Sequence, residues 1–259
     1  MPFSAVPWKK KSLWFTAALT ALAALGALIA VSLWPERVSP REARAQAGDR
    51  SLKEGVVDCR RLKCIALTFD AGPGKDTPRL LDMLKEEKVQ ATFFLLGKNH
   101  VMKYPDVVRR IAAEGHEVAN HTWTHKILTD QDPDGIRTEL ARTQDAIARL
   151  TGRKPTLMRP PQGRTNEDVS RICEELNLAQ VLWSATAKDY STTDSELISD
   201  RILDAASRDG IILLHDIYRG TVPAVPRIIT ELKKRGYTFV TVPQLLAPAI
   251  AEPGTVYKP

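Results

Sequence analysis

The chain has 259 residues, of which 43% are hydrophobic and 26% are charged, and its formal net charge is +6. This balance is ordinary for a globular protein. The basic residues lie beside acids in helical segments and form no stripe with aromatic residues, so nucleic-acid binding is not expected. Their scatter indicates a solvated surface, with weak attraction to anionic lipids or polymers as the alternative.

The N-terminal segment predicts a membrane anchor. Lys9, Lys10 and Lys11 precede residues 12–34, which contain neither a charge nor a proline. A helix of that length spans about 35 Å, enough to cross a hydrocarbon core. The lysines place residues 1–11 in the cytoplasm and the rest outside, so we expect a single-pass cell-membrane protein with an extracytoplasmic body. A cleaved signal peptide is the alternative, although its apolar region is usually shorter.

The remaining chain divides by composition. Residues 35–57 are polar and predict a linker that extends at most about 80 Å; residues 58–248 form the domain and 249–259 a tail. Outside the cytoplasm Cys59 and Cys64 are candidates for a local disulfide, whereas Cys173 lies in a helical pattern and is expected to be a buried apolar residue. No spacing of these thiols suits a zinc site.

From residue 64 onward, short apolar runs alternate with longer amphipathic segments. Strands are predicted at 64–69, 91–96, 116–119, 156–159, 179–183, 211–214 and 238–240, and helices at 77–88, 105–114, 134–150, 166–176, 194–207 and 223–235. This alternation is typical of a parallel sheet with helices outside. About seven repeats in this length favour an α/β fold that is a deformed (β/α) barrel, preceded by one transmembrane helix.

Polar residues at the predicted strand ends are candidates for chemistry. Asp70 ends an apolar strand and is either a general base or a turn cap. His121 and His125 are spaced i, i+4, so on one helical turn both rings would face a metal, although a structural pair is equally compatible with this spacing. His215 follows another apolar run, and a carboxylate such as Asp189 facing it would make it a general acid.

A fourth string is the turn that follows Arg159, with Pro160, Pro161, Gln162 and Gly163. It is either a loop stiffened by prolines, or an arginine paired to a buried carboxylate next to a backbone N–H that stabilises an oxyanion.

Taken together, these strings resemble the polysaccharide deacetylases of carbohydrate esterase family 4, which share the NodB homology domain. The resemblance covers about residues 60–246. It rests on ALTFDAGPG at 66–74, HTWTH at 121–125, RPPQG at 159–163, the segment 183–190 and the leucines before His215. Gln162 stands where the family usually has a tyrosine.

The resemblance implies a role for each matching position. Asp70 would be the catalytic base, oriented by Arg159, and His215 would protonate the leaving amine, tuned by Asp189. His121 and His125 would hold a divalent metal, with zinc expected and cobalt, manganese or nickel as alternatives. The oxyanion and substrate residues would be Gln162, Leu213, Trp183 and Tyr190.

One position departs from the pattern, because Ala71 replaces the aspartate that is the family's third metal ligand. Two histidines alone would leave a weak site, which water or Asp70 would have to complete. We nevertheless expect a metal-dependent hydrolase that removes N-acetyl groups from an envelope polysaccharide, with peptidoglycan as the first candidate. We expect the protein to be a monomer. Chitin-like oligomers and O-acetylated glycans are alternative substrates, and a catalytically silent glycan-binding protein is the alternative from another class.

Overall fold

The computed structural model describes residue 1 and residues 37–259, except residues 49, 53 and 54. The predicted membrane span at 12–34 lies outside the described residues. Among the helices that are described, none is both long and apolar enough to cross a membrane.

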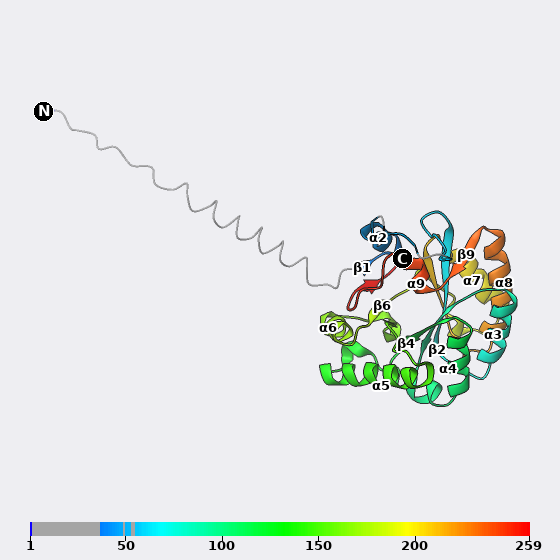
Figure 1. Ribbon diagram of the computed structural model, residues 1–259, viewed down its shortest axis with the longest axis horizontal. Coiled ribbons are helices and arrows are strands. Elements are labelled where there is room, and N and C mark those ends of the chain that lie inside the picture. The colour runs from blue at the N-terminus through cyan, green and yellow to red at the C-terminus, as the bar shows by residue number, and fades with distance from the viewer. Residues whose placement is uncertain (2–36, 49, 53–54) are drawn as a thin grey trace. The chain divides into compact units, whose positions relative to one another are not determined.

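The domain alternates strands and helices along the chain (Figure 1). The strands are β1 Arg37–Val38, β2 Lys63–Gly72, β3 Thr92–Leu95, β4 Glu117–Asn120, β5 Leu157–Met158, β6 Ala179–Val181, β7 Ala185–Thr186, β8 Gly210–Leu214, β9 Tyr237–Val240 and β10 Val256–Tyr257. The α-helices are α2 Pro40–Gln46, α3 Thr77–Glu86, α4 Pro105–Ala113, α5 Pro133–Thr151, α6 Glu167–Glu175, α7 Ser195–Ala205, α8 Thr221–Lys234 and α9 Val242–Leu246. Short turns of other helix types are η1 Gly97–Val101, η2 Leu128–Asp130, η3 Pro161–Gly163 and η4 Asp189–Ser191.

The strands form one curled sheet in which every recorded pairing is parallel. Its order is β1-β10-β6-β5-β4-β3-β2-β8-β7, and β9 pairs with the first half of β2. Within the described residues β1 and β7 do not pair, so the sheet is a curled half-barrel, consistent with the predicted deformed barrel but with ten strands instead of about seven.

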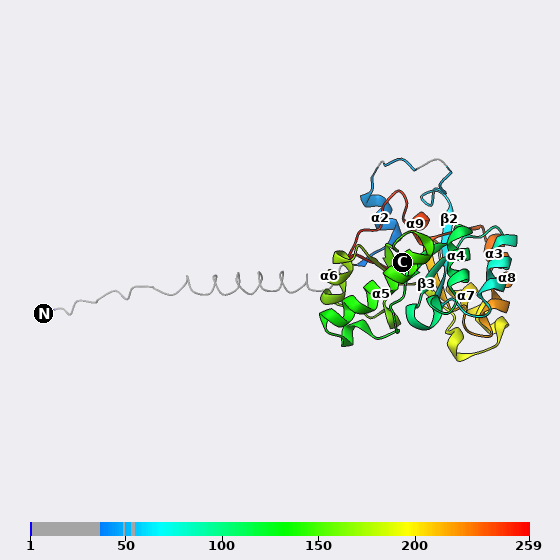
Figure 2. The same ribbon diagram turned by 60° about the horizontal axis from the view of Figure 1, so that its bottom comes forward.

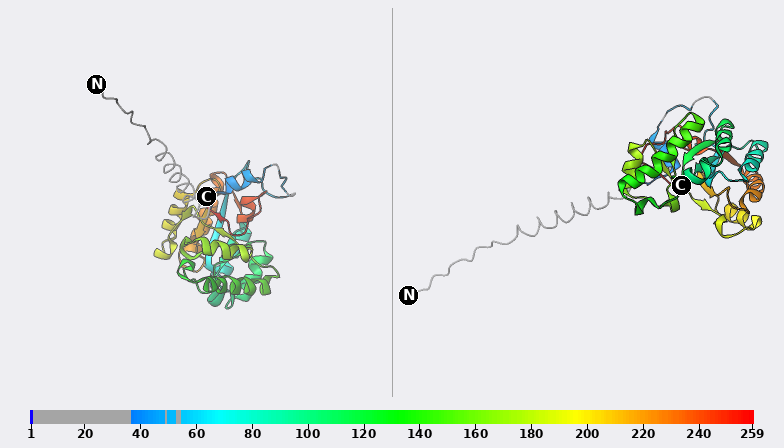
Figure 3. Two further views of the ribbon diagram at one scale, coloured as in Figure 1. Left: turned by 90° about the vertical axis from the view of Figure 1, so that its left-hand side faces the viewer. Right: turned by 90° about the horizontal axis from the view of Figure 1, so that it is seen from below.

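Helices cover the outside of the sheet in the same order as the strands they connect, as the side and bottom views show (Figures 2 and 3). Packing contacts run from α6 to α5, α4, α3, α8 and α7. Leucines 80, 81 and 84 are fully buried on one face of α3, as their helical spacing predicts. Helix α5 begins at Asp132, which accepts a hydrogen bond from the Gly135 N–H, and ends at the left-handed Gly152.

Two segments outside the predicted domain belong to it. Residues 37–46 of the predicted linker form β1 and α2, and residues 256–257 of the predicted tail form β10, which lies between β1 and β6. Figure 1 shows α2 beside α9, nearly 200 residues further along the chain. Arg44 of α2 is buried and donates to the Leu245 carbonyl of α9. The linker prediction was therefore wrong for these residues, because such short elements leave no periodic apolar pattern.

The cysteine predictions are confirmed. A disulfide joins Cys59 and Cys64 at the start of β2. Cys173 is free and fully buried on α6, in an apolar cluster that α6 forms with α5, η2 and β5.

Candidate active site

Polar side chains gather at the carboxyl edge of the sheet. Asp70 lies near the end of β2, while His121, Arg159 and His215 directly follow β4, β5 and β8. Parallel strands bring these ends to one edge, where barrel folds place their chemistry. The negative charge of Asp70 acts to raise the pKa of the His121, His125 and His215 rings, so the three rings lie within electrostatic range of that carboxylate.

A β-bulge sets the direction of the Asp70 side chain. The register between β2 and β3 shifts between Asp70 and Gly72, and Ala71 in between has a left-handed backbone with φ of 61°. Gly72 is required because a Cβ there would collide with the Asp216 carboxylate. The bulge therefore ends the regular strand at the residue that carries the carboxylate.

Arg159 holds the Asp70 carboxylate inside the protein. Both side chains are buried, and the Arg159 Nη1 donates to Asp70 Oδ1 at 2.6 Å and to Thr68 Oγ1 at 2.7 Å. The Nε atom donates to the Val181 carbonyl at 3.0 Å, and the guanidinium lies over the Phe94 ring. A buried ion pair satisfied on every side keeps Asp70 in one orientation. Sequence reasoning placed the arginine here but missed Thr68.

The two histidines of the HTWTH string lie side by side, although not on a helix. Their ring centroids are 4.9 Å apart. Residues 121–125 form a loop in which Thr122 and His125 are left-handed, with φ of 70° and 64°. The predicted helical turn was therefore wrong, since an i, i+4 spacing also fits a loop that turns back on itself. Glu139 of α5 fixes this loop by accepting from the N–H groups of Trp123 and Thr124.

Both rings are suited to bind a metal in their neutral form. Burial lowers the pKa of His121 to about 4, although the nearby charge of Asp70 acts in the opposite direction. Burial also lowers the pKa of His125. The His121 Nδ1 lies 2.8 Å from the Arg159 carbonyl, so it donates there and leaves Nε2 as the ligand atom.

These residues fit a metal only in part. Two adjacent neutral imidazoles, one oriented by a backbone carbonyl, are the donor set of a divalent transition metal. Within the described part of the chain, however, no group of three His, Cys, Asp or Glu side chains is arranged to hold an ion. Ala71 offers no ligand at the position next to Asp70, so water would have to complete the coordination shell.

On the opposite side of the site, Asp189 holds His215. The Asp189 carboxylate accepts from the His215 N–H at 2.7 Å, from His215 Nδ1 at 2.8 Å and from the Thr221 hydroxyl at 2.7 Å. Burial by itself would lower the pKa of His215, but the hydrogen bond and charge of Asp189 outweigh it and the pKa is raised. The pairing that sequence reasoning proposed between these residues is therefore present, with Nε2 of the ring left for a substrate.

The predicted oxyanion and substrate residues lie in β8 or in the segments that follow β5, β6 and β7. Gln162 is exposed and left-handed in η3, and the half-buried Trp183 ring lies 5.7 Å from the Arg159 guanidinium. Leu213 is 5% exposed at the end of β8. Tyr190 is 59% exposed, and its ring centroid lies 6.3 Å from that of His215. Their roles in binding stay predictions.

The structure adds Asp216, whose role was not predicted although it directly follows His215. It is fully buried, accepts from the Thr77 hydroxyl and lies against Gly72. Burial raises its pKa to about 6. Asp216 thus positions the turn after β2 and does not react itself. Its position directly after His215 in the sequence was the one feature that could have pointed to it.

Backbone strain is concentrated at this edge. Left-handed residues other than glycine occur in the loops that carry the site: Ala71, Thr122, His125, Gln162 and Lys188. Each such residue costs about 1–2 kcal/mol, and the cost is greatest for a β-branched side chain such as Thr122. Strain of this kind persists at positions where loop geometry serves function.

Unpaired cations surround the site. Lys98, Lys126, Lys188 and Arg219 follow β3, β4, β7 and β8, and all four side chains are exposed. None of them makes an ion pair with any residue that the structure describes. Composition alone could not reveal this pattern, because strands far apart in sequence bring these residues to one edge.

Comparison of the chain with known proteins identifies the family to which it is similar. Residues 58–181 match the family model described as polysaccharide deacetylase. A peptidoglycan-N-acetylglucosamine deacetylase of Listeria monocytogenes is 40% identical over 191 residues, covering 73% of this chain and 40% of that protein. A peptidoglycan-N-acetylmuramic acid deacetylase of Bacillus subtilis is 40% identical over 194 residues, covering 74% of this chain and 40% of that protein. The chain thus spans less than half the length of these curated relatives.

A solved structure described as a T48 deacetylase with substrate matches more completely. It is 42% identical and superposes with a TM-score of 0.74, covering 78% of this chain and 99% of the other. On the motifs, the fold and these matches, the chain belongs to the polysaccharide deacetylase family.

Proposed function

We propose that the chain is a metal-dependent hydrolase that removes N-acetyl groups from peptidoglycan. The observation that carries this proposal is the convergence of a buried Asp70–Arg159 pair, two neutral histidines and a His215–Asp189 pair at one edge of the sheet. A base, an acid and a metal ligand set in one site are the parts of amide hydrolysis.

The chain's own residues divide the proton transfers. Asp70 accepts a proton from the attacking water, whose oxygen bonds to the acetyl carbonyl carbon. The Gln162 N–H stabilises the oxyanion that results. His215 then donates its Nε2 proton to the sugar nitrogen as the C–N bond breaks, leaving acetate and a free amine. Asp189 keeps the ring protonated at Nδ1 and correctly oriented.

His121 and His125 would hold the metal, with zinc as the expected ion and cobalt, manganese or nickel as alternatives. When bound, the metal polarises the carbonyl and makes a bound water more acidic. Leu213 would line the pocket for the acetyl methyl group, and Trp183 and Tyr190 would contact the sugar.

Two observations support peptidoglycan over a neutral glycan such as chitin. The curated relatives reported above act on peptidoglycan by name. The exposed cations Lys98, Lys126, Lys188 and Arg219 would attract a polymer that carries carboxylates, whereas a neutral oligomer gains nothing from them.

We also propose that residues 12–34 anchor the protein in the cell membrane, with the domain outside and the protein a monomer. The apolar run and its flanking lysines support the anchor. The Cys59–Cys64 disulfide supports an oxidising compartment.

The experiment is acetate release by the purified full chain, with metal content measured on the same sample. N-acetylated peptidoglycan should yield acetate that EDTA abolishes and that Asp70→Asn removes without unfolding the protein. Ala71 favours a second candidate, a silent glycan-binding protein, because it removes a ligand. Folded protein that binds peptidoglycan but retains no metal and releases no acetate after metal addition would establish that candidate instead.

A salt series separates the substrates. Turnover of peptidoglycan should fall between low and high ionic strength while turnover of chitin oligomers stays level, because screening weakens only the first interaction. The variant Lys126→Glu should show the same selective loss, with Lys85→Glu on α3 as a control away from the strand ends. Equal salt dependence for both substrates would contradict the role of these cations.

A further inference from the structure

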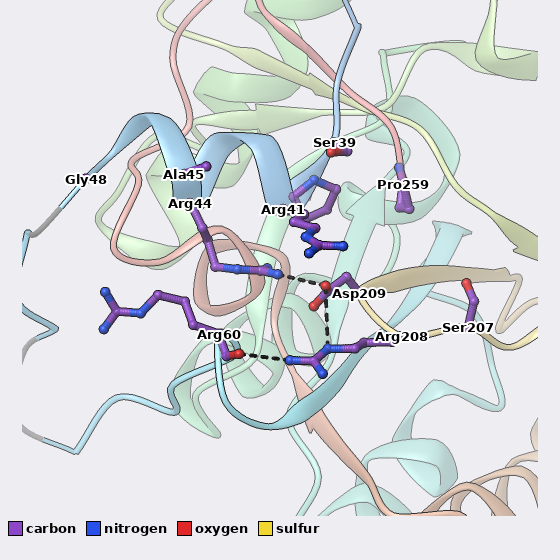
Figure 4. A pocket seen from close by; sticks show the side chains of 11 residues that line it. Ser39, Arg41, Arg44, Ala45, Gly48, Arg60, Ser207, Arg208, Asp209 and Pro259 are labelled. Carbon is purple, nitrogen blue, oxygen red and sulfur yellow. Dashed lines mark hydrogen bonds and ion pairs between the residues drawn. The ribbon is translucent and has the colours of Figure 1, made fainter.

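A second site lies at the opposite end of the sheet from the catalytic residues. A cavity of about 870 Å³ is bordered by α2, the turn at 207–209 and the segment that carries the disulfide (Figure 4). These parts precede β2 and β8, whereas Asp70 and His215 lie at the other ends of the same strands. Seven residues of β2 separate Lys63 from Asp70, which corresponds to about 23 Å.

The cavity carries an excess of positive charge. Figure 4 shows Arg44 reaching Asp209 from α2 and Arg208 reaching the backbone of Arg60. Arg44 is 4% exposed and pairs with Asp209 at 2.8 Å, whereas Arg208 lies 3.9 Å from that carboxylate. Arg41 also lines the cavity and makes no ion pair or hydrogen bond through its side chain with any described residue. Four arginines and one aspartate thus line the cavity, beside the last residue, Pro259.

Arg44 and Arg208 are held in position before any ligand arrives. The Arg208 Nη2 donates to the Arg60 carbonyl at 2.9 Å, and the Arg44 Nη1 donates to the Leu245 carbonyl at 2.7 Å. The fixed guanidinium fork matches oxyanions that accept several hydrogen bonds. Because the two segments are more than 150 residues apart, the cluster is a product of the fold and not of a local basic run.

We propose that this cavity binds a phosphate ester of glycerol. A phosphate monoester presents three charged acceptor oxygens in a tetrahedral arrangement, whereas a carboxylate presents two in one plane, so the phosphate can accept from more guanidinium groups at once. The volume exceeds that of an inorganic phosphate and leaves room for the polyol.

The source of the phosphate is a membrane lipid headgroup, an assignment that rests on the membrane anchor proposed above. Only Pro35 and Glu36 lie between the predicted span and β1, and α2 follows three residues after β1 begins. Along the sequence, Arg41 and Arg44 therefore follow the predicted span by seven and ten residues. Glycerophosphate headgroups are abundant anions at a bilayer surface.

The test titrates glycerol 1-phosphate into the full chain held in a neutral glycoside detergent, which contributes no phosphate. Saturable one-to-one binding is expected, and Arg41→Gln should weaken it about tenfold because one charged hydrogen bond is lost. Arg61→Gln is the matched control, since Arg61 is exposed nearby but does not line the cavity. Absence of saturable binding, or equal loss in both variants, would overturn the proposal.

The same titration in nanodiscs that contain phosphatidylglycerol tests whether the phosphate comes from a lipid headgroup. A headgroup already in the cavity should compete and lower the apparent affinity for glycerol 1-phosphate in the wild type. Unchanged affinity would exclude the lipid and leave a soluble or polymeric glycerophosphate as the ligand. Asp70→Asn should bind like the wild type, so a failure of deacetylation and a failure of this site are distinguishable in the same preparation.

Discussion

Replacing Arg159 by lysine tests whether the guanidinium fork, and not only its charge, organises the site. Lysine can still reach Asp70 with a positive charge, but its single nitrogen cannot also serve the carbonyls of Val181 and Leu182. In the wild type those carbonyls accept at 3.0 Å and 3.4 Å in a fully buried environment. Leaving buried acceptors unpaired, together with the lost stacking on Phe94, should destabilise the fold by about 2–4 kcal/mol.

Urea unfolding of the full chain in neutral detergent measures the change in the free energy of unfolding. Acetate release measures the effect of the substitution on turnover. A displacement of Asp70 by about 1 Å should lower kcat by about 100-fold while KM changes little. Arg201→Lys is the control, because Arg201 donates to a single carbonyl, that of Ala187, at 2.9 Å. If Arg159→Lys proves no more destabilising than Arg201→Lys and kcat is unchanged, the fork does not position the base.

Three further changes give distinct readouts. In the wild type, Asp189 outweighs the effect of burial and raises the pKa of His215. Asp189→Asn should therefore lower that pKa, so that kcat begins to fall at a lower pH on the alkaline side of its pH profile. An alkaline side that does not move would contradict the role of His215 as the acid. Because a raised folded pKa adds stability below it, the variant should also lose stability at acid and neutral pH but not above that pKa. Ala71→Asp should increase metal retention through dialysis, since aspartate tolerates the left-handed backbone and adds a ligand; retention equal to that of Ala71→Asn would mean that no ligand position is open. Replacing Cys59 and Cys64 by serine should cost about 2 kcal/mol in urea unfolding yet leave kcat intact, and a lost kcat would show that the far end of β2 depends on the disulfide.

Local patterns were enough to predict the strand ends that carry chemistry. The apolar runs before Asp70 and His215 had to be buried strands, and the leucines of α3 had the spacing of a buried helix face. Parallel pairing then brings the polar residues after each run to one edge. The fold class and the location of the site followed from these two facts.

Tertiary contacts were beyond such reasoning. The loop at His121 and His125 is set by Glu139 of the following helix α5, so the helical interpretation of their spacing was wrong. The position of Asp216 against Gly72 depends on a bulge that no periodicity shows. The cavity arginines come from two segments whose contact only the folded chain creates.

The pairing of β1 with β10 determines when, during synthesis, the domain can complete its fold. Among the described strands β1 has β10 as its only partner, and β10 lies at residues 256–257. The first strand of the domain therefore emerges some 200 residues before the strand that receives it. Until residues 256–257 have been synthesised, β1 and the edge of β6 that β10 covers are both open to wrong partners. Folding factors that meet this chain should thus act on a domain that is almost complete but still open at one edge.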